Sequence, residues 1–167
     1  SLAALDIESG KALWYNKDED IRFRSSTPIA VDDNTLLVAD DDAIMLVDMN
    51  SGDITSKTNF EEYSFSSSAK PALMDRMAYI PTSNDGIVAF DLDSKKLVWH
   101  FETGESILFT APYAGKGKKI VESTPVIDGE NVIFGANDGF IYTVNAKSGE
   151  LIDRKFAGSA VLGKIAV

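Results

Sequence analysis

The sequence has 167 residues, 44% of them hydrophobic, which is enough for one domain with a substantial core. Acidic residues outnumber basic ones by 26 to 16, and the net charge of −10 argues against binding to nucleic acid or to anionic lipid. No stretch approaches the roughly 20 apolar residues that cross a bilayer, so we expect no direct membrane insertion. The absence of cysteine excludes disulfides and thiol catalysis. The single histidine, His100, speaks against a histidine-based metal site or a Ser-His-Asp triad.

An eleven-residue motif occurs four times along the chain. Two copies are nearly identical and two are degenerate: residues 4–14 (ALDIESGKALW), 89–99 (AFDLDSKKLVW), 46–56 (LVDMNSGDITS) and 143–153 (TVNAKSGELID). A second marker, a proline before a short apolar run, recurs in phase at Pro28, Pro71 and Pro125. The period is about 43 residues, with about 11 extra residues before Pro125, so the chain is a repeat protein with one insertion.

Each repeat predicts four short strands. In the unit 26–60, the apolar, β-branched runs are 28–31, 35–39, 43–47 and 54–57, and turn-forming residues separate them. The turn at Asp40-Asp41-Asp42 is matched in the later units by Asn-Asp-Gly at 84–86 and 137–139. A four-stranded antiparallel unit of this period is typical of a β-propeller blade.

In chain order, residues 1–16 are expected to supply the last two strands of one blade. Three whole blades and the first strand of a further one follow: 26–60, 69–102, 123–157 and 160–167. Residues 103–119 are the insertion. We therefore predict an all-β propeller with about four blades present, as part of a larger propeller of seven or eight blades. A fragment and a chain that pairs with another copy through its open blade edges are both open interpretations.

The motif Ala-x-Asp-x-x-x-Gly-Lys-x-x-Trp resembles the repeat of pyrroloquinoline-quinone-like, or quinoprotein-like, β-propellers. The first copy matches throughout and the copy at 89–99 lacks only the glycine. WD40 repeats need Gly-His and Trp-Asp dipeptides and kelch repeats need Gly-Gly, and the chain has none of these patterns. The resemblance covers the whole chain apart from the insertion.

The resemblance implies that the tryptophan of one motif stacks on the glycine peptide of the next blade's motif. Trp14 is then expected near Gly52, and Trp99 near Gly149. The remaining contact lacks both partners, because Ser56 stands in place of the tryptophan and Lys95 in place of the glycine. The aspartates at the third position of the motif are expected to accept hydrogen bonds from turn amides: Asp6, Asp48 and Asp91.

The candidate ligand residues lie on the face where the insertion and the turn at Asp40–Asp42 meet. In the insertion these are Phe109, Tyr113, Lys116 and Lys118. The alternative for the basic run 115–119 is a solvated loop, since it lacks the spacing of a P-loop. Asp40, Asp41 and Asp42 are candidate calcium ligands, with a polar hairpin turn as the alternative. Glu102, Glu105 and Glu122 could act as acids or bases, and the alternative is ordinary surface carboxylates.

The resemblance also bears on cofactors and location. The quinoprotein dehydrogenases typically use a vicinal cysteine pair, a calcium site and a tryptophan floor, so with no cysteine here we expect no pyrroloquinoline quinone. Many relatives are bacterial and work outside the cytoplasm, where they bind proteins or glycans. We predict a non-catalytic scaffold that binds a protein or a glycan or small-molecule ligand in the periplasm or outside the cell. The alternative is the propeller portion of an enzyme, either a quinoprotein dehydrogenase or an accessory to a phosphoesterase or other hydrolase.

Overall fold

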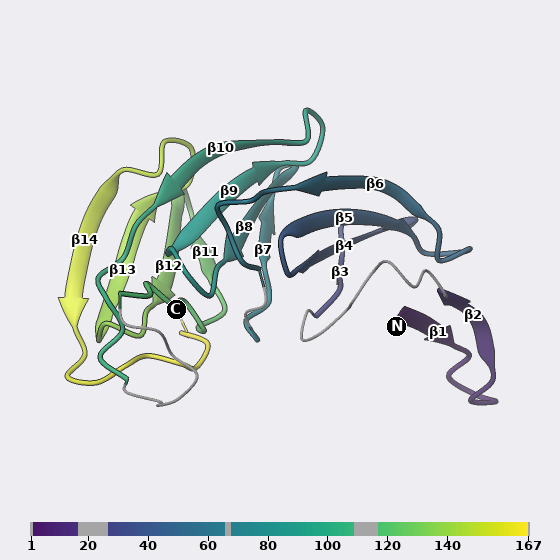
Figure 1. The fold of residues 1–167 in the computed structure, drawn as a ribbon, viewed down its shortest axis with the longest axis horizontal. Helices are drawn as coiled ribbons and strands as arrows, with labels where there is room; N and C mark the ends of the chain where they lie inside the picture. Colours follow the sequence, from purple (N-terminus) through teal and green to yellow (C-terminus); the bar gives the residue numbers. More distant parts are fainter. Residues whose placement is uncertain (1, 17–26, 66–67, 109–116, 167) are drawn as a thin grey trace.

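The computed structural model describes residues 2–16, 27–65, 68–108 and 117–166. Within these residues the chain forms strands and no helix, so no helix there could span a membrane. The strands make one two-stranded sheet and three four-stranded sheets, all antiparallel, and within each sheet the strands lie in chain order. Figure 1 shows the four sheets following one another around an arc, as the blades of a propeller do. The predicted all-β propeller is confirmed.

The arc begins with the N-terminal hairpin, β1 (Leu2–Leu5) and β2 (Ala12–Asn16). Blade 1 consists of β3 (Ile29–Ala30), β4 (Thr35–Asp40), β5 (Ala43–Asp48) and β6 (Ile54–Asn59). Blade 2 consists of β7 (Ala72–Met74), β8 (Met77–Pro81), β9 (Ile87–Asp91) and β10 (Lys96–Phe101). Blade 3 consists of β11 (Val126–Asp128), β12 (Asn131–Gly135), β13 (Phe140–Asn145) and β14 (Leu151–Phe156). In each blade the first strand lies on the inner side of the arc and the fourth on the outer side (Figure 1).

The repeated motif folds the same way in each sheet. Its third residue accepts the turn amides: Asp48 Oδ1 takes hydrogen bonds from Asn50 N (2.8 Å) and Ser51 N (2.9 Å). Asn145 does the same in blade 3 without a charge. The motif's glycine has a positive φ, and Lys95, which replaces it in blade 2, is held at φ 58°. The third and fourth strands shift register just after this turn in all four sheets.

The core lies between the sheets rather than inside them. One apolar cluster joins the hairpin to blade 1 around Val38, Met45 and Val47, and a second joins blades 1 and 2. The third, around Tyr79, Trp99 and other side chains of β8 to β13, joins blades 2 and 3. Central strands such as β5 are therefore almost fully buried, whereas β14 is exposed along its whole length. Burial of the central strands is expected where a sheet is covered on both faces by its neighbours, and in the described residues blade 3 packs against blade 2 alone.

Residues 160–166, the described part of the segment expected to begin another blade, form no strand with the other described residues, and the assignment of this segment to a further blade stays a prediction. The segment crosses the end of blade 3 instead. Val161 N donates to Ala136 O (3.1 Å), and its side chain packs directly on Gly135. An extended segment becomes a strand only when it pairs with another strand over several residues, and here a single backbone bond is made.

Candidate functional site

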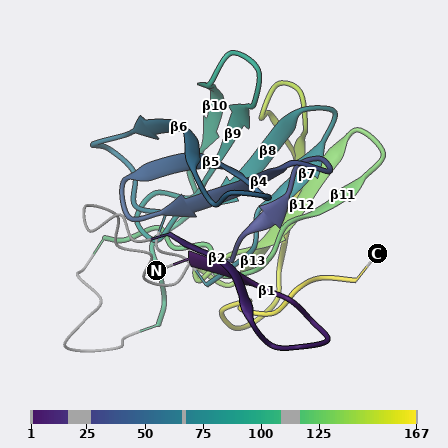
Figure 2. The same cartoon turned by 90° about the vertical axis from the view of Figure 1, so that its right-hand side faces the viewer.

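The two faces of the arc differ in character. One face, called here the insertion face because residues 103–119 belong to it, carries the turns between second and third strands. It also carries the connections that lead from one blade to the next. These connections run along the turns and bond to their backbone: Phe65 N to Asp41 O, Lys119 N to Asn84 O, and Asn137 N to Ile120 O. In the described residues, backbone hydrogen bonds therefore link the connections on this face to the turns beside them. Figure 2 shows the arc turned by 90°.

The turn at Asp40–Asp42 lies on this face as a hairpin turn. The carboxylate of Asp40 is buried and accepts a hydrogen bond from Asp41 N (3.1 Å). Asp42 accepts from Phe60 N with its carbonyl and from the Asn59 side chain with its carboxylate. The described residues contain no group of three or more His, Cys, Asp or Glu side chains placed to hold a metal ion. Asp41 and Asp42 thus hold the following connection in place, and the Asp40 carboxylate fixes its own turn.

An ion-pair cluster ties the insertion to blade 2. Lys119 pairs with Glu102 and with Asp85, whose Oδ1 lies 3.5 Å from its Nζ. The hydrogen bond from Lys119 lowers the pKa of the Glu102 carboxyl and raises that of the Lys119 ammonium. His100 Nε2 lies 2.6 Å from the Asp85 carbonyl, which can only accept, so Nε2 carries the hydrogen. His100 also contacts the ring of Tyr63. The carboxylate of Glu102, a candidate acid or base, is therefore engaged by Lys119.

A second cluster, which is buried, fixes the start of the insertion on blade 3. Asp138 accepts hydrogen bonds from Tyr142 Oη (2.5 Å), Gly104 N (2.7 Å) and Phe140 N (3.0 Å). Burial first, and then the hydrogen bond to Asp138, raise the pKa of Tyr142 to about 12. The phenol thus stays protonated and keeps donating.

Glu122 accepts a hydrogen bond from Asn137 Nδ2 (2.7 Å). Asn137 Oδ1 is buried and has no hydrogen-bond partner among the described residues. Glu105 is exposed. Glu102, Glu105 and Glu122 therefore stand in separate settings, and the first and last are held by a lysine and an amide rather than by each other.

Three of the four ligand candidates in the insertion, Phe109, Tyr113 and Lys116, lie outside the described residues. The fourth, Lys118, is exposed, and its backbone carbonyl accepts from Ser106 N (2.9 Å).

The docking residues lie where the motif placed them. The indole of Trp14 covers Gly52, where an added Cβ would lie 2.4 Å from the ring, and Trp99 covers Gly149 in the same way at 2.7 Å. Each indole N–H donates to a carbonyl of the covered turn, Trp14 to Met49 O (2.8 Å) and Trp99 to Ala146 O (2.9 Å). A side chain at either glycine would displace the ring, so the two residues are required together.

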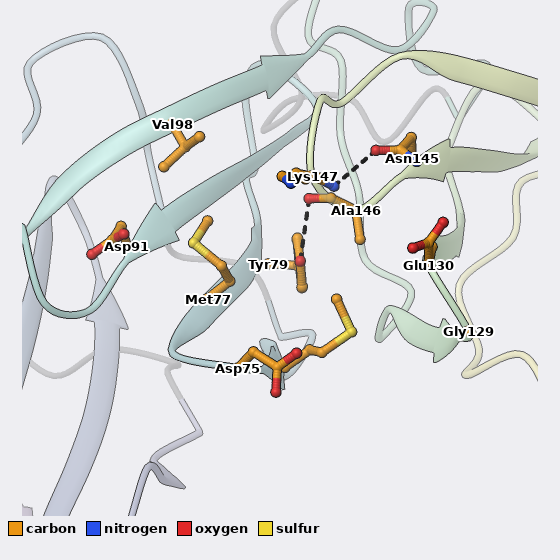
Figure 3. Close-up of a pocket in the computed structure, with 11 residues that line it drawn as sticks. Asp75, Met77, Tyr79, Asp91, Val98, Gly129, Glu130, Asn145, Ala146 and Lys147 are labelled. Carbon is orange, nitrogen blue, oxygen red and sulfur yellow. Dashed lines mark hydrogen bonds between the residues drawn. The ribbon is translucent and has the colours of Figure 1, made fainter.

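On the opposite face a pocket of about 630 Å³ opens between blades 2 and 3. Its floor is apolar, and Figure 3 shows Met77 and Tyr79 at its centre. Tyr79 is fully buried and its hydroxyl donates to Ala146 O (3.2 Å), the carbonyl that also receives the Trp99 N–H. The docking tryptophan and the pocket floor are therefore anchored on the same atom.

Carboxylates surround this floor. Asp75 and Asp91 of blade 2 face Glu130 and Lys147 of blade 3 across the opening (Figure 3). Asp91 is fixed by turn amides, which lower the pKa of its carboxyl. Sequence reasoning missed this pocket because its residues come from four separate turns and strand ends. The only available signal was that the β7–β8 and β11–β12 turns occupy equivalent places in adjacent repeats.

The family model described as outer membrane protein assembly factor BamB matches residues 1–161. The chain belongs to this family of PQQ-like propeller repeats. Among solved structures, BamB from Moraxella catarrhalis is similar over 97% of this chain and 48% of its own, with TM-score 0.71 and 20% identity. The computationally designed Ika4 protein is similar over 92% and 85%, with TM-score 0.67 and 14% identity.

Quinohemoprotein alcohol dehydrogenase from Comamonas testosteroni is similar over 78% of this chain and 20% of its own, with TM-score 0.59 and 20% identity. Curated protein sequences give no match. Identities this low show the fold alone. The chain spans about half the length of the BamB structure it resembles.

Proposed function

We propose that this chain is a non-catalytic, protein-binding part of a propeller that acts outside the cytoplasm, in the assembly of outer-membrane proteins. The observation that carries the proposal is the match to the assembly-factor family over residues 1–161. The structural neighbour named BamB, which is similar over nearly the whole chain, supports it.

The chemistry of the insertion face supports a scaffold. Several of its ionisable side chains serve internal contacts: Glu102 and Asp85 pair with Lys119, and Asp138 holds Tyr142 and the Gly104 amide. A general acid or base needs a free proton-transfer path to a substrate. Carboxylates that fix loops in place suit a rigid presenting surface better.

The alternative is the propeller portion of an enzyme, and the similarity to the Comamonas alcohol dehydrogenase is what favours it. The residues present do not fit pyrroloquinoline quinone. Both tryptophans are engaged in blade docking, and the sequence has no cysteine. Adding the quinone with calcium and following dye reduction tests this. We expect no reduction above a heat-treated control, and quinone-dependent turnover would favour the enzyme.

The proposed role is tested in the organism that encodes the chain by deleting the gene and quantifying outer-membrane proteins by mass spectrometry. We expect a selective fall in outer-membrane β-barrel proteins that a plasmid copy reverses, with inner-membrane proteins unchanged. Unchanged outer-membrane proteins in the deletion strain would contradict the proposal. A glycan is the other ligand class, and glycan binding without a change in the outer membrane would favour it.

We also propose that open blade edges allow association with a second copy. The hairpin exposes Leu5 (63%), Ile7 (98%) and Leu13 (67%), and β14 exposes Phe156 (64%). Gly10 repeats the turn that receives an indole at Gly52, yet an added Cβ there would meet nothing within 4 Å. Light scattering across a concentration series is expected to show dimers, and a monomer throughout would contradict this.

A further inference from the structure

The pocket between blades 2 and 3 has an apolar floor that is open to solvent. Val98, on the outer strand β10, is 52% exposed, and Met74 and Met77 are only partly buried. Methionine is flexible and polarisable, so it adapts to apolar groups of different shape. At about 630 Å³ the pocket has room for a long aliphatic side chain and its flanking backbone.

The rim is acidic. Asp75, Asp91 and Glu130 line it against one cation, Lys147. The carboxylate of Asp91 accepts hydrogen bonds from its own turn. The side chains of Asp75 and Glu130 are exposed and make no ion pair or hydrogen bond within the described residues. These two carboxylates stand on opposite sides of the opening, on blade 2 and blade 3 (Figure 3). The pocket therefore offers two free negative charges beside an apolar floor.

The backbone that presents Asp75 is held in an uncommon conformation. Asp75 (φ 47°) and Arg76 (φ 70°) are both left-handed, where glycine or asparagine is usual. Arg76 is pinned by Asp93 Oδ1 (3.0 Å) and by Asp32 Oδ2 of blade 1 (3.4 Å). Across the pocket Gly129 (φ 56°) takes the corresponding bend. Asp75 and Arg76 are the two central residues of the hairpin turn between β7 and β8, and a positive φ at both positions is the geometry of a type I′ turn.

We propose that this pocket binds an extended segment of a partner protein in which lysine or arginine flanks a long apolar side chain. The apolar side chain enters between Met74, Met77 and Val98, and the flanking cations pair with Asp75 and Glu130. Charge complementarity selects this occupant, because an acidic segment would meet two unpaired carboxylates. The inference rests on the proposed function in that the partner is a protein.

The test uses labelled synthetic peptides and fluorescence anisotropy with the purified protein at low ionic strength. The probe is Gly-Ser-Lys-Leu-Lys-Ser-Gly. Its matched controls replace both lysines by glutamate or the leucine by serine. We expect binding of the probe alone, weakened by salt because exposed charges are screened.

Protein variants assign the binding to the pocket. Asp75→Asn combined with Glu130→Gln is expected to weaken binding about tenfold, as the loss of two exposed charge pairs would. Asparagine tolerates a positive φ, so the turn is retained. Val98→Arg fills the opening with a bulky side chain whose positive charge repels the lysines of the peptide, and it is expected to abolish binding. Glu8→Gln, at a carboxylate on the hairpin that is also exposed, should bind as the unaltered protein does, and thermal melts verify that each variant folds.

Equal affinity for the lysine and glutamate peptides, or full affinity in Val98→Arg, would overturn the inference. The two proposals fail separately. A deletion strain that loses outer-membrane proteins, rescued equally by Val98→Arg, would leave the function standing and remove the pocket. If these variants abolish peptide binding but deleting the gene leaves the outer membrane unchanged, the pocket proposal stands and the proposed function is contradicted.

Discussion

The interface between blades 2 and 3 and the one between blades 1 and 2 join the same kind of sheet by different means. In the first, Trp99 covers Gly149 and is 9% exposed. In the second, Ser56 and Lys95 occupy the corresponding positions. There Phe65 packs edge-on against Phe60 within the apolar cluster, and Arg76 bridges the two blades through Asp32. The docking pair is therefore replaceable, provided that the connection between blades supplies other apolar side chains.

The difference also concerns function. Only a tightly fixed interface keeps an open pocket between two blades at constant shape, and the pocket floor shares the Ala146 carbonyl with Trp99. We infer that the docked interface provides the rigidity the pocket needs.

The largest expected effect is that of Trp99→Ala, which removes the ring and its hydrogen bond and leaves a cavity. Large-to-small changes of this kind lower the free energy of unfolding by about 4 kcal/mol. Denaturant unfolding measures it, with Val98→Ala on the same strand as a control expected to change stability by about 0.5 kcal/mol or less. A loss as small as the control's would show that docking does not hold the interface.

Phe65→Ala tests the interface that lacks the docking pair. Phe65 is 1% exposed, so its removal is expected to lower stability by about 3 kcal/mol. Leu162→Ala, at a side chain that is 50% exposed, is the matched control. If Phe65→Ala behaves like that control, the aromatic cluster does not substitute for docking.

A double-mutant cycle can install the missing pair. Ser56→Trp alone places a ring against a side-chain-bearing turn, and Lys95→Gly alone relieves the positive φ of Lys95. Together they are expected to stabilise the protein beyond the sum of the single changes, with a coupling of about 1 kcal/mol. Strict additivity would mean that the two positions do not meet across this interface.

The smallest expected effect is on the pH dependence of stability, which should differ between motif turns that carry an aspartate and the turn that carries Asn145. Hydrogen bonds from turn amides lower the pKa of Asp48 below 3.8, as they do for Asp91. The stabilisation is therefore present above pH 3.8 and is lost as pH falls through the lower folded-state value. Asn145 makes the same bonds without titrating. Asp48→Asn should make the acid-induced loss of stability shallower, and an unchanged acid limb would contradict the assignment.

The repeat made most of the fold predictable. Blade strands, the hairpin turns and the Trp14 and Trp99 contacts depend on local pattern and on one motif meeting the next. The role of the segment 160–166 stays a prediction, because an apolar run shows only that a strand could form, and its pairing depends on distant residues. The pocket could not be predicted from the sequence, because Asp75 and Glu130 become neighbours only once blades 2 and 3 are packed.

The central claim is that the pocket between blades 2 and 3 binds an extended basic segment of a partner protein. Hydrogen–deuterium exchange with and without the Lys-Leu-Lys peptide tests it most directly. The account predicts added protection at the β7–β8 and β11–β12 turns, with the insertion face unchanged. Protection confined to the insertion face, or none in the presence of saturating peptide, would contradict it.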